Sequence, residues 1–208
     1  MVNFENLNKR QFDGVGKYGF PRIAPVQTLP TGSFIPMNYA KTAKSQENKV
    51  VHCFVDDYQF VRYWNQPDTY IPLLRKFQAV FSPDFSLYTD MPTAMQIYNH
   101  YRKHWLAAYW QENGITVYPS ISWSTPDSFD WCFDGEPQNG IVAVSSIGTQ
   151  RNAESRQLFL QGYEEMMKRL SPTWVLFYGA VPPECEWHAV SIPSFTDTIS
   201  QRTHNADR

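Results

Sequence analysis

Three aspartates stand where carboxylates could bind a metal ion or exchange protons. Asp56 and Asp57 end one apolar run of the sequence, and Asp84 follows a second, shorter one. Converging carboxylates bind Mg²⁺ or Mn²⁺, or act as acid and base when their surroundings separate their pKa values. We therefore predict catalytic roles for Asp56, Asp57 and Asp84, with a Mg²⁺ or Mn²⁺ ion on Asp56 and Asp84. The alternative is structural, because Asp57 can cap the segment that follows it.

A second candidate feature is the polar turn 145–152, which leads from an apolar run into a helical pattern. Its hydroxyls, its arginine and the free N–H groups at the start of a helix suit a phosphate or carboxylate group. The residues predicted to bind the ligand here are Ser145, Ser146, Thr149 and Arg151. The turn matches neither a dinucleotide-binding glycine motif nor a Walker A sequence. The alternative is an ordinary turn in which Asn152 caps the helix.

Two aromatic residues at predicted strand ends, Trp123 and Tyr178, complete the predicted ligand-binding set. Aromatic rings in such places can stack on a nucleic-acid base. The alternative for Trp123 is packing between a helix and the sheet, since a tryptophan buries a large area.

A pair of histidines, His100 and His104, has the spacing of two metal ligands on one helix. No third ligand is evident from the sequence, and Lys103 between them indicates a solvated helix face. We therefore predict no metal site here.

The elements that must position these residues are visible from residue 50 onward, where apolar runs alternate with helical patterns. This is the pattern of successive strand–helix–strand units. The prediction is an α/β fold, a single domain with an open, mostly parallel sheet of five or six strands. A partial barrel is the alternative, because a full eightfold barrel takes about 250 residues. Ligands of such folds bind outside the carboxyl ends of the strands, so we expect Asp56 and Asp84 in one cleft with Ser145 or Ser146 on its wall.

The first part of the chain reads differently. Residues 1–49 are rich in glycine and proline and show no helical or strand period. They also carry aromatic residues, so we predict an irregular arm packed on the body through Phe20, Phe34 and Tyr39. Residues 50–197 are the predicted α/β domain, and residues 198–208 the predicted flexible tail.

Composition excludes several classes of protein. The chain has 208 residues, a formal charge of -2 and only 18% charged residues, so we expect no extended binding of duplex DNA. No apolar run is long enough to span a membrane, and the start of the chain lacks a secretory signal. The number and spacing of the three cysteines give no sign of a disulfide, which is typical of free thiols in a reducing compartment. We therefore expect a cytoplasmic protein; the oligomeric state is not predicted.

Several short stretches together are similar to a known family. They are residues 38–43 (NYAKTA), 55–60 (VDDYQF), 83–88 (PDFSLY), 90–92 (DMP) and 121–123 (ISW). From about residue 38 to residue 178 the chain resembles an uncharacterised family of bacteria and phages, catalogued as domain of unknown function 4417. The resemblance implies a bacterial or phage cytosolic setting, often on mobile elements, and assigns no catalytic residue.

Two kinds of function follow. The first is binding or processing of a small phosphorylated, base-containing ligand, such as a nucleotide or a nucleic-acid end, at the carboxyl edge of the sheet. As an enzyme it would be a metal-dependent phosphoester hydrolase or transferase. The second is a non-catalytic interaction protein that blocks a host defence protein, since low charge and many Tyr, Trp, Asn and Gln residues suit an interface.

Overall fold

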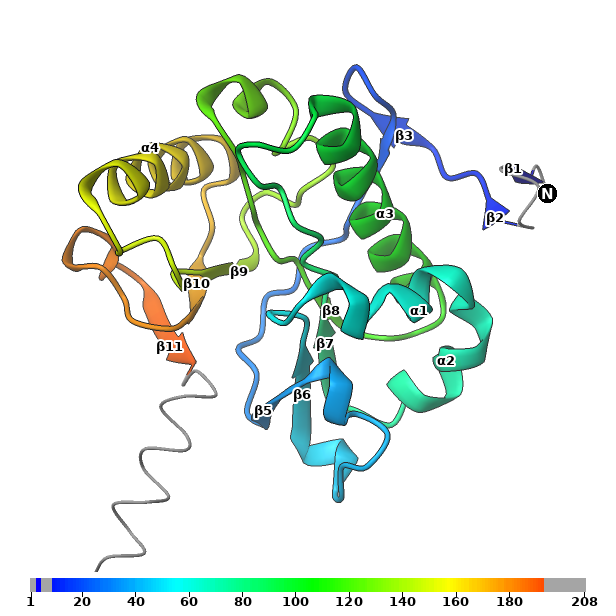
Figure 1. The fold of residues 1–208 in the computed structure, drawn as a ribbon. Coiled ribbons are helices and arrows are strands. Elements are labelled where there is room, and N and C mark those ends of the chain that lie inside the picture. Colours follow the sequence, from blue (N-terminus) through cyan, green and yellow to red (C-terminus); the bar gives the residue numbers. More distant parts are fainter. Residues whose placement is uncertain (1–2, 5–8, 193–208) are drawn as a thin grey trace, which may run out of the picture.

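The computed structural model describes residues 3–4 and 9–192, and its centre is a set of parallel strands (Figure 1). The strands in chain order are β5 (Ser33–Pro36), β6 (Lys49–His52), β7 (Ala79–Phe81), β8 (Val117–Tyr118), β9 (Ile141–Ser145), β10 (Trp174–Tyr178) and β11 (Ala189–Ile192). Strands β5 to β8 form one parallel sheet in sequence order, and β9 to β11 form a second. A single parallel bridge between Ser120 and Ala143 joins the two. The predicted single sheet of five or six strands is thus replaced by two parallel sheets of four and three strands.

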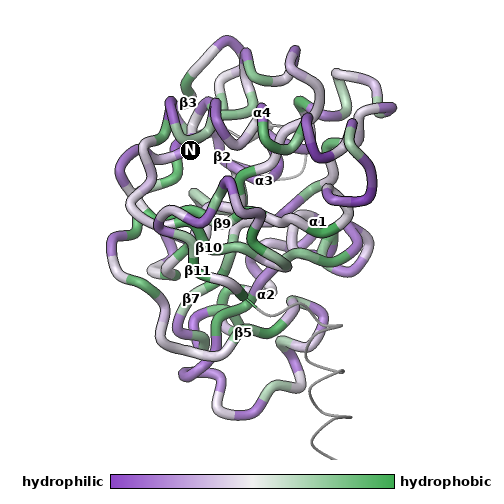
Figure 2. The backbone as a smooth tube through the Cα atoms, turned by 90° about the vertical axis from the view of Figure 1, so that its left-hand side faces the viewer, coloured by the Kyte–Doolittle hydropathy of each residue, from purple (hydrophilic) through white to green (hydrophobic). Residues whose placement is uncertain are grey.

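Alternate residues of each strand point to opposite faces, and both faces of the inner strands are buried. Val50, Phe81 and Leu176 contribute to one apolar cluster shared by the two sheets, whereas Val51 and Val175 face the helices. Figure 2 shows this hydrophobic centre as the green portion of the chain around the strands. Sequence order and a shared inner cluster are both features of β/α barrels. The central runs are apolar on both sides because both faces of β6, β7, β9 and β10 are largely buried.

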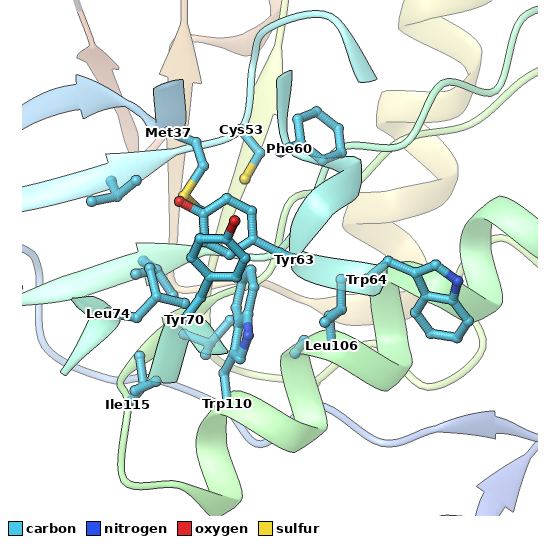
Figure 3. Close-up of a cluster of buried hydrophobic side chains, with 14 of the residues drawn as sticks. Met37, Cys53, Phe60, Tyr63, Trp64, Tyr70, Leu74, Leu106, Trp110 and Ile115 are labelled. Carbon is cyan, nitrogen blue, oxygen red and sulfur yellow. The ribbon is translucent and has the colours of Figure 1, made fainter. Parts of the chain in front are cut away.

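Three helices cover the four-stranded sheet: α1 (Val61–Asn65), α2 (Pro67–Leu74) and α3 (Thr93–Glu112). Their side of the core is aromatic: the ring of Tyr63 contacts those of Tyr70 and Trp110, in the same cluster as Leu74 (Figure 3). Gly114, in the left-handed region at φ 79°, follows the end of α3 as its sequence predicts.

The remaining helix, α4 (Ala153–Leu170), covers the three-stranded sheet. Its start is confirmed, because the side chain of Asn152 accepts a hydrogen bond from Ser155 N at 2.8 Å. The start of α3 differs from expectation. The cap residue is Pro92 and no side chain caps it, so Asp90 does not fill the capping role that its position suggested.

The N-terminal segment is less irregular than predicted. It supplies β5, an edge strand of the first sheet, as well as two short antiparallel pairs, β1 (Asn3–Phe4) with β2 (Lys9–Arg10) and β3 (Gly14–Val15) with β4 (Phe20–Pro21). Phe20 is fully buried and Phe34 packs on Phe81, whereas Tyr39 is exposed. Proline and glycine break its periodicity, but one neighbouring strand is enough to order β5. The predicted tail, residues 198–208, lies outside the described residues.

Candidate functional site

The carboxyl ends of β6 to β10 surround a cleft made of two adjoining hollows of about 520 and 380 Å³. We call it the carboxyl-edge cleft. Both hollows are lined by Asp84, Leu87, Tyr88, Ser122, Trp123 and Ser145. The smaller one adds Asp56 and Tyr178, and the larger one adds Asp90 and Thr149. The structure therefore brings Asp56, Asp84 and Ser145 to one cleft, as the parallel strand ends led us to expect.

Asp84 is the most perturbed carboxylate of this cleft. Burial is the main cause that raises its pKa to about 7, and the nearby charge of Asp57 adds to the rise. Lys103 and a hydrogen bond with the Ser122 side chain act in the opposite direction. A carboxyl group that titrates near neutral pH can both give and take a proton, which is what a general acid or base requires.

Polar side chains of α3 hold the loop that carries Asp84. Asn99 donates to Ser86 O at 2.7 Å, and Gln96 donates to Met91 O at 2.8 Å, both from α3. At the base of the loop Ser120 donates two hydrogen bonds to Ser82, from its N to Ser82 Oγ and from its Oγ to Ser82 O, and these tie the end of β7 to the segment after β8. The position of Asp84 is thus fixed by contacts on both sides of the loop.

Asp57 does not share this position. Its carboxylate accepts hydrogen bonds from Ser86 N at 3.2 Å and from Ser86 Oγ at 2.9 Å. It lines neither hollow of the cleft, and the geometry gives it an anchoring contact instead of the predicted catalytic one. The suggested cap is also absent, since Asp56 holds the capping position of the turn Asp57–Gln59 without a side-chain cap bond.

Asp56 is exposed, and its carboxylate accepts a long hydrogen bond from Gln59 Nε2 at 3.5 Å. Within the described residues the three aspartates do not form a group of three metal-ligating side chains within 4.8 Å of one another. Two carboxylates on one cleft still suit Mg²⁺, because this ion is commonly held by one or two carboxylates together with substrate phosphates.

The turn after β9 divides into lining and structural residues. Ser145 and Thr149 line the cleft, and Thr149 Oγ1 donates to Ser146 O at 2.8 Å. Ser146 is buried and donates to Ala180 O at 2.6 Å, so it ties β9 to the segment after β10 and does not face the cleft. Arg151 is exposed beside Gly148 and is not on the cleft wall.

The two predicted aromatic residues both reach the cleft wall. Trp123 packs on Phe159 of α4, with ring centroids 5.4 Å apart, and lies so close to Gly162 that a Cβ there would come within 2.2 Å of its Nε1. Tyr178 stacks on Phe54 at 5.0 Å. Trp123 is therefore both a packing residue and a lining residue, and the two alternatives drawn from the sequence are compatible.

Ser122, Asp90 and Tyr88 are among the lining residues that were not in the predicted site. All three lie within the short stretches that carry the family resemblance. Their signal is that each follows a strand by only a few residues, on the edge where parallel strands gather side chains.

The helix face that carries His100, Lys103 and His104 is buried, which corrects the prediction of a solvated face. Lys103 Nζ lies 2.5 Å from Glu136 Oε1, and His104 Nε2 lies 3.1 Å from the same oxygen. Burial alone would raise the pKa of Glu136, but Lys103 and His104 outweigh it and hold the pKa below its ordinary value. Glu136 is the third potential ligand beside His100 and His104, which was not evident from the sequence.

Two further expectations can be compared with the described residues. No helix in this part of the chain has the length and apolar character needed to cross a membrane. Cys53, Cys132 and Cys185 are free and buried, as their spacing indicates.

Comparison with known proteins identifies the family. A family model described as a domain of unknown function, DUF4417, matches residues 12–196. The Gene 1 protein of Mycobacterium phage L5 is 38% identical over 180 residues, which is 85% of this chain and 78% of that protein. The Gene 1 protein of Mycobacterium phage D29 is 36% identical over 184 residues, which is 85% of this chain and 66% of that protein. No solved structure matches. The chain belongs to the DUF4417 family, and its curated relatives are phage proteins.

Proposed function

We propose that this member of the DUF4417 family binds a small phosphorylated, base-containing ligand in the carboxyl-edge cleft and exchanges a proton with it through Asp84. The observation that carries the proposal is the convergence of Asp84, Ser122, Ser145 and Trp123 on one cleft at the carboxyl ends of parallel strands. Ligands of α/β proteins gather at this edge. The cleft volumes suit a ligand of nucleotide size.

Aromatic side chains on the wall support a base as part of the ligand. Trp123 borders both hollows, and Tyr88, which is 63% exposed, stands at their rim. A base placed against Trp123 would stack on its indole, an interaction worth about 1–3 kcal/mol. The hydroxyl groups of Ser122, Ser145 and Thr149 would face the sugar or phosphate.

The phosphate group of the ligand would be bound by the turn after β9 and by a metal ion. The described wall of the cleft carries carboxylates but no lysine or arginine, so an anionic ligand needs a cation to accompany it. A Mg²⁺ or Mn²⁺ ion on Asp56 and Asp84 would supply that charge, as in other sites that bind substrate phosphates. Arg151 beside Gly148 is the nearest cationic side chain of the turn.

The supported chemistry is phosphoester hydrolysis or transfer. Asp84 would accept the proton of the attacking hydroxyl group or water as its oxygen bonds to phosphorus and the bond to the leaving oxygen breaks. The bound metal ion would polarise the phosphoryl oxygens. Asp57 is left out of this scheme because Ser86 occupies its carboxylate.

A thermal-shift experiment tests the proposal. Purified protein is heated with a nucleoside monophosphate, the matching nucleoside or ribose 5-phosphate, each with and without Mn²⁺. We expect the nucleoside monophosphate with Mn²⁺ to raise the melting temperature most, because ligand binding stabilises the folded state. The Trp123→Ala variant should lose the part of the shift that depends on the base, and Asp84→Asn the part that depends on Mn²⁺.

Asp57→Asn is the matched control, since it removes the same charge from the neighbouring strand end at a residue that lines neither hollow itself. It should keep the ligand-dependent shifts of the parent protein. Equal melting temperatures with and without every ligand would contradict the proposal and leave the interaction protein as the better reading.

A specific observation favours that second candidate. Tyr58 and Tyr88 are 75% and 63% exposed, and Tyr88 and Ile147 border the cleft. Exposed tyrosines of this kind are enriched in protein interfaces. A partner that covers the cleft mouth would lose affinity in a Tyr58→Ser variant, whereas binding of small ligands would persist because Tyr58 lines neither hollow.

A further inference from the structure

We propose that His100, His104 and Glu136 form a second site, separate from the carboxyl-edge cleft, that binds a transition-metal ion of the Zn²⁺ class. One nitrogen of each histidine and one carboxylate oxygen of Glu136 all lie within 4.8 Å of one another. Imidazole together with a carboxylate is a ligand set that suits Zn²⁺ and its neighbours in the first transition row.

The orientation of both rings directs one nitrogen of each toward the cluster. His100 Nε2 lies 3.2 Å from Asp134 O, and His104 Nδ1 lies 2.8 Å from Pro21 O. A carbonyl oxygen only accepts, so each of these ring nitrogens carries a proton. His100 Nδ1, which has no hydrogen-bond partner, is the unprotonated nitrogen of its ring. His104 Nε2 donates to Glu136 Oε1 at 3.1 Å, and a bound metal ion would displace that proton. Donation of the second N–H to a backbone carbonyl is the arrangement that orients histidines in metal sites.

Two buried atoms of this cluster lack a partner. His100 Nδ1 and Glu136 Oε2 make no hydrogen bond, although His100 is 1% and Glu136 8% exposed. Unpaired buried polar atoms are costly, and a metal ion would satisfy both at once. His104 Nε2 lies 3.1 Å from the other oxygen of this carboxylate, Glu136 Oε1.

The surroundings hold the ligands in place and give them access to solvent. Phe20 contacts the edge of the His100 ring at 4.4 Å, and the two histidine rings are 4.3 Å apart. Glu136 and Asp134 line a cavity of about 790 Å³, which would provide a path for an ion and room for a further ligand. Lys103 occupies Glu136 Oε1 and leaves Oε2 as the oxygen available to a metal.

Titration of the chelator-treated full chain with ZnCl₂, followed by isothermal calorimetry, tests the site. We expect one Zn²⁺ per chain. His100→Asn and His104→Asn should each weaken binding by more than ~100-fold, beyond the range for losing an outer-shell partner. His52→Asn is the matched control, because His52 is also buried but lies in β6, outside the cluster, and should bind Zn²⁺ like the parent. His188→Asn controls for binding at an exposed histidine.

A measurement on the unmodified protein keeps the test valid if a histidine variant fails to fold. X-ray absorption at the zinc edge of the loaded parent should show two imidazole ligands with oxygen completing the shell. The absence of stoichiometric Zn²⁺ binding, a first shell without imidazole, or equal affinity in the parent and both folded cluster variants would overturn the assignment.

Discussion

Two polar regions of this protein differ in how far their side chains are exposed to water. The carboxyl-edge cleft collects side chains from loops after the strands, and most of them remain partly exposed. Lys103 and His104, on the buried face of α3, form a cluster with Glu136 that is almost fully buried. In the cleft, burial raises the pKa of Asp84. In the cluster, Lys103 and His104 lower the pKa of Glu136 and keep its carboxylate ionised. The difference teaches that burial alone does not set the state of an acid; its partners do.

The largest expected effect tests the buried side of this comparison. Glu136→Gln leaves the Lys103 ammonium buried without its counter-charge, so the free energy of unfolding should fall by about 3–5 kcal/mol. Urea denaturation measures it. Glu165→Gln is the control, because Glu165 pairs with Arg169 on the surface of α4 and its loss should change the free energy of unfolding little. Similar losses in both variants would show that burial does not distinguish the two ion pairs.

The cleft should behave in the opposite way when its carboxylate is neutralised. Asp84 has a pKa of about 7 in the folded protein against an ordinary 3.8, so the folded state retains the proton longer than the unfolded chain. Its contribution to stability is therefore complete below about pH 4 and is lost as the pH rises to about 7. Asp84→Asn should raise the free energy of unfolding at pH 8 by up to about 4 kcal/mol, at ~1.4 kcal/mol per pKa unit, and the partial exposure of Asp84 reduces this gain.

Unfolding of parent and variant by urea at pH 4 and pH 8 checks the sign. The gain should appear at pH 8 and vanish at pH 4. A variant that is less stable than the parent at both pH values would mean that Asp84 is a structural residue of the loop.

The packing behind the cleft gives a smaller effect. Gly162→Ala places a Cβ against the Trp123 ring, and such overpacking costs about 1–3 kcal/mol, less the ~1 kcal/mol that alanine returns as a better helix former. The tryptophan fluorescence should shift as Trp123 moves from the cleft wall. Gln161→Ala, on the exposed side of the same helix turn, should change neither property.

The smallest effect separates the two neighbouring aspartates. Asp57→Asn weakens the hydrogen bonds to Ser86 and should lower the free energy of unfolding by about 1 kcal/mol at pH 8, where Asp84→Asn raises it. Chemical denaturation of both variants side by side decides the point. Changes of the same sign would remove the distinction between an anchoring and a titrating carboxylate.

The sequence by itself determined the parallel strands and the edge where their ends meet. Continuous apolar runs require burial on both faces, and parallel strands bring their carboxyl ends together, so Asp84, Trp123 and Ser145 could be placed on one cleft from local patterns. The division into two sheets and the strand at 33–36 could not, because β5 has no periodicity of its own and depends on β6 for its hydrogen bonds.

Side-chain partners far apart in the chain were decided only by the tertiary structure. Gln96, Asn99, His100, Lys103 and His104 recur at helical spacing, yet polar residues at that spacing predict a solvated face as readily as a buried one. Glu136 is 33 residues from Lys103, and the fold alone brings the two into contact. The same holds for Asp57, whose neighbour along the chain faces the cleft while its own carboxylate turns to Ser86, 29 residues away. Local patterns fix where the backbone places a side chain, but its charge state and its role depend on groups that arrive from elsewhere in the chain.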